Sequence, residues 1–133
     1  MLTNKQKFQL EFEMKSSAKI LFSYISTASG LAEWFADNVT INPEKIFTFL
    51  WDNETHKAKM AAHRTNHFCR FEYLPEVKED EKDPSYFEIR LEVNEFTQTT
   101  FVKVIDYSDF DDQKELQDLW EGLIDNLKTV VGG

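Results

Sequence analysis

The segment formed by residues 112–131 most constrains the fold, because its apolar residues recur every three or four positions. This spacing places them on one stripe of a helix, while Gln117, Asp118 and Glu121 fall on the opposite side. The stripe consists of Leu116, Leu119, Trp120, Leu123, Ile124, Leu127, Val130 and Val131. A helix with one apolar stripe must bury it against another layer, and strand-like segments precede it. We therefore predict that this helix packs along a sheet.

The first strand is predicted from strict alternation of apolar and polar residues. Residues 7–14 place Phe8, Leu10 and Phe12 between polar or charged neighbours such as Glu11. Side chains in a strand point alternately to opposite faces, so this pattern is typical of a strand with one buried face and one wet face.

A helical segment separates this strand from the remaining ones. Ser16 and Ser17 offer N-cap hydroxyls to a helix that we expect to end before Gly30, and residues 31–36 form a second, short helical turn. Further strands are predicted at residues 45–52, 55–65, 67–74, 85–93 and 97–107. A charged loop at residues 75–84 interrupts them. Consecutive strands of this kind predict an antiparallel meander.

Composition excludes several classes of partner. The chain has 133 residues and 41% hydrophobic content, enough for one core, so we expect a single domain over residues 1–133. The net charge of −9 repels phosphate backbones and anionic membranes, which argues against nucleic acid and against membrane insertion. Cys69 is the one cysteine and allows no internal disulfide, and no apolar run reaches the length of a signal peptide or membrane span. The sequence therefore predicts a cytoplasmic protein.

Histidine and cysteine chemistry is weakly supported. Strand periodicity puts His56 and His63 on opposite faces, which argues against a metal site that also includes His67. Cys69 and His67 share a face, but no third group is evident to orient the histidine. Surface histidines and a buried, inert thiol are the favoured interpretations. No phosphate-binding loop or metal motif is found, so no cofactor is expected.

Acidic residues give two further candidates for a functional site. Glu88 and Glu92 alternate with Arg90 and could form a carboxylate pair for acid-base chemistry, although the wet face of a sheet explains them more simply. Asp106 shares its predicted face with two valines and could stand at a pocket rim. A solvent-exposed strand end is the favoured interpretation of Asp106.

The order of these elements resembles the START-like (SRPBCC) superfamily. A strand, a helix leading into the turn at residues 31–35, a meander and a closing helix with Leu119 and Trp120 carry the resemblance. It implies the α+β helix-grip fold, in which a curved antiparallel sheet of about six or seven strands wraps the C-terminal helix, with a short helical pair after strand one. The adjacent Trp34 and Phe35 most resemble the branch related to the activator of the heat-shock-protein-90 ATPase.

The resemblance implies a cavity between the last helix and the concave sheet, suited to a lipid-like or polyketide-like molecule. Many relatives carry a glycine-rich loop between the second and third strands, whereas the corresponding residues 40–44 of this chain contain no glycine. The residues expected to line the cavity are Trp34, Phe47, Phe49, Trp51, Phe71, Tyr73, Phe87, Ile89, Val102, Val104, Trp120, Leu123 and Ile124. Each of them has simple core packing as its alternative, because aromatic residues at strand or helix spacing are more often core. The tryptophans and Tyr73 carry polar groups that could orient a ligand.

Two classes of function remain from these patterns. The first is non-enzymatic binding of a hydrophobic small molecule in this cavity. The second is a protein-interaction or co-chaperone-like module that uses the acidic surface or a sheet edge. A cyclase or hydrolase of the same fold is a weaker alternative, because the acid-base groups of such relatives are not identifiable here. A monomer and a homodimer through a free edge strand both stay open.

Overall fold

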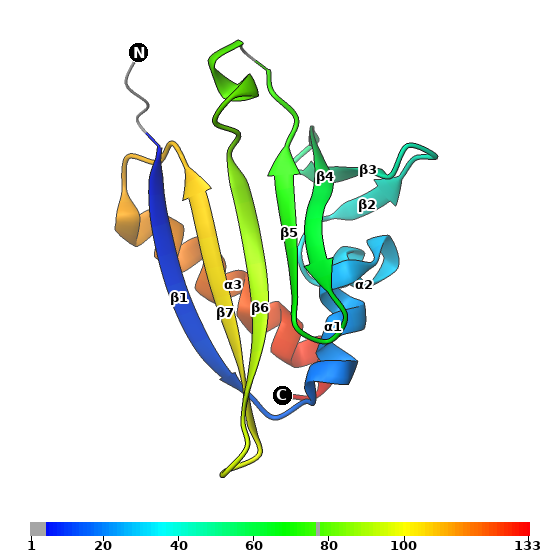
Figure 1. Cartoon of the computed structure of the whole chain (residues 1–133), viewed down its shortest axis with the longest axis vertical. Helices are drawn as coiled ribbons and strands as arrows, with labels where there is room; N and C mark the ends of the chain where they lie inside the picture. The colour runs from blue at the N-terminus through cyan, green and yellow to red at the C-terminus, as the bar shows by residue number, and fades with distance from the viewer. Residues whose placement is uncertain (1–4, 77) are drawn as a thin grey trace.

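The computed structural model describes residues 5–76 and 78–133 (Figure 1). Its centre is a seven-stranded sheet in the order β1-β7-β6-β5-β4-β3-β2, with every neighbouring pair antiparallel. The strands are β1 (Gln6–Met14), β2 (Asn38–Ile41), β3 (Ile46–Trp51), β4 (Glu54–Arg64), β5 (Phe68–Tyr73), β6 (Tyr86–Asn94) and β7 (Thr99–Ser108). The helices are α1 (Ala18–Ser26), α2 (Ala28–Ala32), the 3-10 turn η1 (Lys78–Glu81) and α3 (Gln113–Val131).

The predicted packing of the C-terminal helix on the sheet is confirmed. In Figure 1 α3 runs behind β1, β7 and β6, and α1 and α2 lie on the same side of the sheet. This is the helix-grip arrangement. Trp120, Ile124 and Leu127 of α3 are almost completely buried, whereas Leu119 is 56% exposed. Leu116, Leu123, Val130 and Val131 also pack against the core, so seven of the eight predicted stripe residues are confirmed and only Leu119 is exposed.

Local side chains fix where the two longer helices begin and end. Ser17 Oγ accepts a hydrogen bond from Ile20 N at 3.2 Å, and Asp112 Oδ1 accepts from Lys114 N at 3.0 Å. Gly132 then ends α3 with a φ of 83°, a conformation that glycine adopts without strain. Ser16 Oγ donates to the Val131 carbonyl at 3.0 Å, which ties the end of α3 to the start of α1.

The region between α1 and β3 differs from the prediction. The short helix is α2 at Ala28–Ala32, earlier than the turn predicted at residues 31–36, because Thr27 Oγ1 caps it by accepting from Gly30 N at 3.0 Å. The following β2 was not predicted. It pairs with β3 through four residues only, too few to show a period, and Val39 alone among them faces the core.

Candidate functional site

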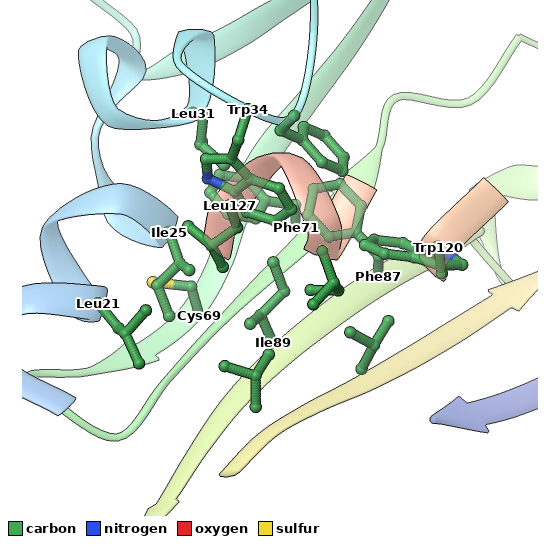
Figure 2. Close-up of a cluster of buried hydrophobic side chains, with 14 of the residues drawn as sticks. Leu21, Ile25, Leu31, Trp34, Cys69, Phe71, Phe87, Ile89, Trp120 and Leu127 are labelled. Atoms are coloured by element: carbon green, nitrogen blue, oxygen red, sulfur yellow. The ribbon is translucent and has the colours of Figure 1, made fainter. Parts of the chain in front are cut away.

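Aromatic side chains fill the space between the helices and the sheet. Phe49, Phe71 and Phe87 point inward from β3, β5 and β6, and each is at most 1% exposed. Phe35, which follows α2, contributes a central ring whose centroid lies 4.7 Å from that of Phe87 and 5.8 Å from that of Trp120. Figure 2 shows the labelled Phe71, Phe87 and Trp120 gathered with aliphatic side chains from the helices. The interior is packed with rings at ordinary contact distances.

The structure gathers the predicted cavity residues into or against this one core. Ten of them are buried: Trp34, Phe47, Phe49, Phe71, Phe87, Ile89, Val102, Val104, Trp120 and Ile124. Trp51, Tyr73 and Leu123 are half-buried and pack against the same cluster. The set is therefore a spatial unit, and Trp51 and Tyr73 reach its boundary with solvent.

Phe35 is the central residue that the sequence reasoning left out of the cavity. Its ring is 2% exposed and also lies 5.0 Å from Trp51 and 5.2 Å from Phe49, measured between ring centroids. The segment around Phe35 is neither a regular helix nor a strand, so no periodicity could place its side chain. Its position next to Trp34 was the only available signal.

The indole N–H groups of the three tryptophans are already engaged within the protein. Trp34 Nε1 donates to the Tyr24 carbonyl at 2.8 Å, and Trp51 Nε1 donates to the Phe35 carbonyl at 2.6 Å. Trp120 Nε1 donates to Asp106 Oδ2 at 2.8 Å. These hydrogen bonds orient the rings, so the polar groups proposed for ligand recognition have protein partners here.

An open cleft lies where the packed core ends. It has a volume of about 760 Å³ and is bounded by the ends of several strands and the segments that follow them. Its lining consists of Trp51, Thr55, His56, Lys57, Tyr73, Leu74, Pro75, Glu76, Ser85, Ser108 and Asp109. Two backbone hydrogen bonds of 2.9 Å hold this lining together, from Tyr73 N to the Ser85 carbonyl and from Leu74 N to the Lys57 carbonyl.

The cleft combines an apolar wall with polar groups of both charges. Trp51, Leu74 and Pro75 supply apolar surface, and the His56 ring lies 5.3 Å from the Trp51 ring between centroids. Hydroxyl groups, a lysine and two carboxylates supply the polar lining. Most of these polar residues were missed from the sequence, because strand ends and loops far apart in the chain bring them together.

Asp106 connects the cleft to the core. It accepts hydrogen bonds from Trp120 Nε1 and, at 2.7 Å, from Ser108 Oγ, a residue of the cleft lining. Asp106 is half-buried, so its predicted place at an exposed strand end is corrected. Burial, and then the negative charge of Asp106, raise the pKa of Tyr73, which keeps its hydroxyl protonated at neutral pH. The cleft lining therefore includes a neutral phenol, and the Asp106 carboxylate is hydrogen-bonded to the lining residue Ser108 without lining the cleft itself.

The other sequence candidates have structural explanations. Cys69 is completely buried, and burial raises the pKa of its thiol to about 12, so it is protonated and shielded as predicted. His63 and His67 are exposed, as predicted. Among the side chains that the structure describes, no three from His, Cys, Asp or Glu converge on a point where a metal ion could bind.

Glu88 is a correction to the predicted wet face of β6. It is only 7% exposed, and its carboxylate lies 2.7 Å from Arg90 Nη1 and 3.9 Å from Arg70 Nη1. Arg70 in turn covers the ring of Tyr86, with Cζ 3.7 Å from the centroid. The flanking arginines bury Glu88 and pair with it, so it holds the outer face together and does not form a carboxylate pair with Glu92.

Comparison with known proteins is decisive for the family. A family model described as a START-like superfamily domain matches residues 2–133. The chain belongs to the START-like superfamily. Among solved structures, a Bacteroides fragilis protein, BfR322, is 36% identical, with 95% of this chain and 90% of that chain covered and a TM-score of 0.64.

More distant START-like folds superpose as well. The Aha1 dimer from Colwellia psychrerythraea shows a TM-score of 0.76 at 15% identity, covering 95% of this chain and 96% of that chain. A Bacillus thuringiensis protein gives 0.75 at 10% identity, covering 96% and 100%. No curated protein matches the sequence. In the part of this START-like domain that the structure describes, no helix is long and apolar enough to cross a membrane.

Proposed function

We propose that this START-like domain binds a hydrophobic small molecule in the open cleft at the strand ends, where the packed core meets solvent. The observation that carries the proposal is the cleft of about 760 Å³ beside a core already filled with rings. Small-molecule sites range over roughly 300–1,000 Å³ and are mostly concave and apolar with a few placed polar groups. The cleft has that size and an apolar wall of Trp51, Leu74 and Pro75, and its lining carries more polar residues than such sites usually have.

The lining favours a ligand with an apolar body and at least one polar group. The apolar body would lie against Trp51, Leu74 and Pro75, where its burial removes apolar surface from water. Its polar group would reach Ser85 or His56 in the same lining. Lipid-like and polyketide-like molecules combine these two properties. The proposal is one of binding without catalysis.

Filling the cleft is expected to abolish most of this binding. In Thr55→Trp, a bulky ring would replace an exposed lining residue, so affinity for a ligand found in a lipid and polyketide panel should fall at least about tenfold. The panel would be screened by native mass spectrometry, and affinities would be measured by isothermal titration calorimetry. Thr40→Trp, on the exposed face of β2 and outside the cleft lining, is the matched control and should bind normally.

Two results would contradict the proposal. One is a bare mass from gently purified protein that stays bare after incubation with the whole panel. The other is equal affinity of Thr55→Trp and Thr40→Trp for the same ligand, which would place the ligand outside the cleft.

Protein interaction is the second candidate, and the exposed Phe96 favours it. Phe96 is 101% exposed at the tip of the β6–β7 hairpin, which projects beyond the rest of the sheet in Figure 1. Asn94 Oδ1 accepts from Phe96 N at 3.0 Å and from Thr97 N at 3.3 Å, and Gln98 Nε2 donates to the Glu95 carbonyl at 2.9 Å. These bonds hold the turn in one shape, and pre-organised aromatic side chains often act as anchors of protein interfaces.

The resemblance to the activator of the heat-shock-protein-90 ATPase suggests a chaperone of the heat-shock-protein-90 class as the partner. If this START-like domain binds it through the hairpin, Phe96→Ala should weaken the complex at least about tenfold. Because the chain carries a net charge of −9, binding to a basic surface of the chaperone should also weaken with added salt. Fluorescence anisotropy with purified chaperone measures both effects. Leu119→Ala, an exposed leucine on α3, is the control. A complex unaffected by Phe96→Ala and by salt would contradict this candidate.

A further inference from the structure

The strand β1 leaves one complete edge of the sheet without a partner in the described chain. It stands at the end of the strand order and pairs with β7 alone, from Gln6 opposite Ser108 to Met14 opposite Thr100. The pairing has no register shift, and β1 contains no proline, no glycine and no residue with positive φ. A long, regular edge of this kind is a template for another strand. The opposite edge, β2, has only four residues.

Charges along β1 are separated by sign. Lys7 lies near the beginning of the strand, and Glu11 and Glu13 lie near its end. All three, with Gln9, are exposed on the same outer face of the sheet. A second copy in parallel would place carboxylate beside carboxylate, which is unfavourable. A second copy in the antiparallel direction would place basic residues beside acidic ones.

A two-fold axis at Leu10 pairs opposite charges on the outer face and apolar side chains on the inner face along β1. It sets Lys7 opposite Glu13 and Gln9 opposite Glu11, and the symmetry repeats each pair. On the inner face the same register sets Leu10 opposite Leu10 and Phe8 opposite Phe12. Leu10 and Phe12 are only half-buried in the single chain, so the second copy would cover apolar surface that one chain leaves accessible.

We propose that two copies of this chain associate through antiparallel pairing of β1 with β1 about Leu10, which extends the sheet across both molecules. Backbone hydrogen bonds between the edges provide the association, and the Lys7–Glu13 pairs select its direction and register. The cleft is lined by residues from other elements, so this assembly is independent of the proposed ligand site.

Charge reversal tests the proposal through its symmetry. Sedimentation velocity over a concentration series should show a dimer for the unmodified chain. Lys7→Glu and Glu13→Lys should each weaken the dimer at least about tenfold, because both symmetry-related pairs become like-charged. An equimolar mixture of the two variants should recover the dimer, since every pair in the mixed dimer again joins opposite charges.

Matched controls separate the interface from general charge effects. Lys59→Glu, on the exposed face of β4, changes the net charge as Lys7→Glu does and should leave the dimer intact. All three substitutions are at exposed positions, and circular dichroism of each variant verifies the fold. A monomer at every concentration, equal behaviour of Lys7→Glu and Lys59→Glu, or no recovery in the mixture would each overturn the proposal.

Discussion

Phe35→Ala is expected to lower the free energy of unfolding by about 3–5 kcal/mol. The Phe35 ring is 2% exposed and makes ring contacts with β3, β6 and α3 through Phe49, Phe87 and Trp120. Removing it takes away apolar burial and leaves a void that neighbouring rings can fill only in part. Urea denaturation followed by circular dichroism measures the loss.

Phe96→Ala is the matched control, because it makes the same chemical change at a fully exposed position. It should alter the free energy of unfolding by no more than about 0.5 kcal/mol. A loss below about 1 kcal/mol for Phe35→Ala would show that the rings are loosely packed. That result would favour ligand binding between α3 and the sheet and would count against the cleft as the principal binding site.

Strand periodicity predicted the inner face of the sheet well, because each long strand has one buried face and one solvent-exposed face. The alternation in β6 correctly placed Phe87 and Ile89 in the core, and the aromatic set of β3 pointed inward as favoured. The same logic failed for Glu88, which lies on the outer face and is nonetheless buried. Its burial comes from Arg70 and Arg90, one of them on a neighbouring strand, and a pattern within one strand carries no information about such neighbours.

The cleft was beyond sequence reasoning for a related physical reason. Its walls come from the ends of strands and from short segments after them, where alternation stops. Trp51 and Tyr73 were predicted because they continue an inward-facing pattern to the strand end. Ser85, Ser108 and His56 join them only through the register of the folded sheet. Periodicity locates a core, whereas a site at its rim depends on tertiary arrangement.

Gly30→Ala is the second substitution expected to lower the free energy of unfolding strongly. The sequence predicted that the first helix ends before this glycine, and α1 ends at Ser26. Gly30 is buried inside the next helix, α2, where the chain passes very close to α1. A Cβ at this position would collide with the Ser23 carbonyl and would lie 2.7 Å from Tyr24 Cα, and both obstacles are backbone. Gly30→Ala should therefore lower the free energy of unfolding by about 3 kcal/mol, the upper end of the usual cost of overpacking. Thermal and urea denaturation measure it.

Gly122→Ala makes the identical change with the opposite expected sign. Gly122 is exposed in the interior of α3, and a Cβ there would meet no atom within 4 Å. Alanine restricts the unfolded chain and favours the helix, so stability should rise by about 0.5–1 kcal/mol. Helix propensity alone favours alanine at both positions, and only the contact with α1 reverses the sign at Gly30. If Gly30→Ala were also stabilising, α1 and α2 could not approach each other as closely as the structure places them. The position of the Phe35 ring in the core would then differ as well.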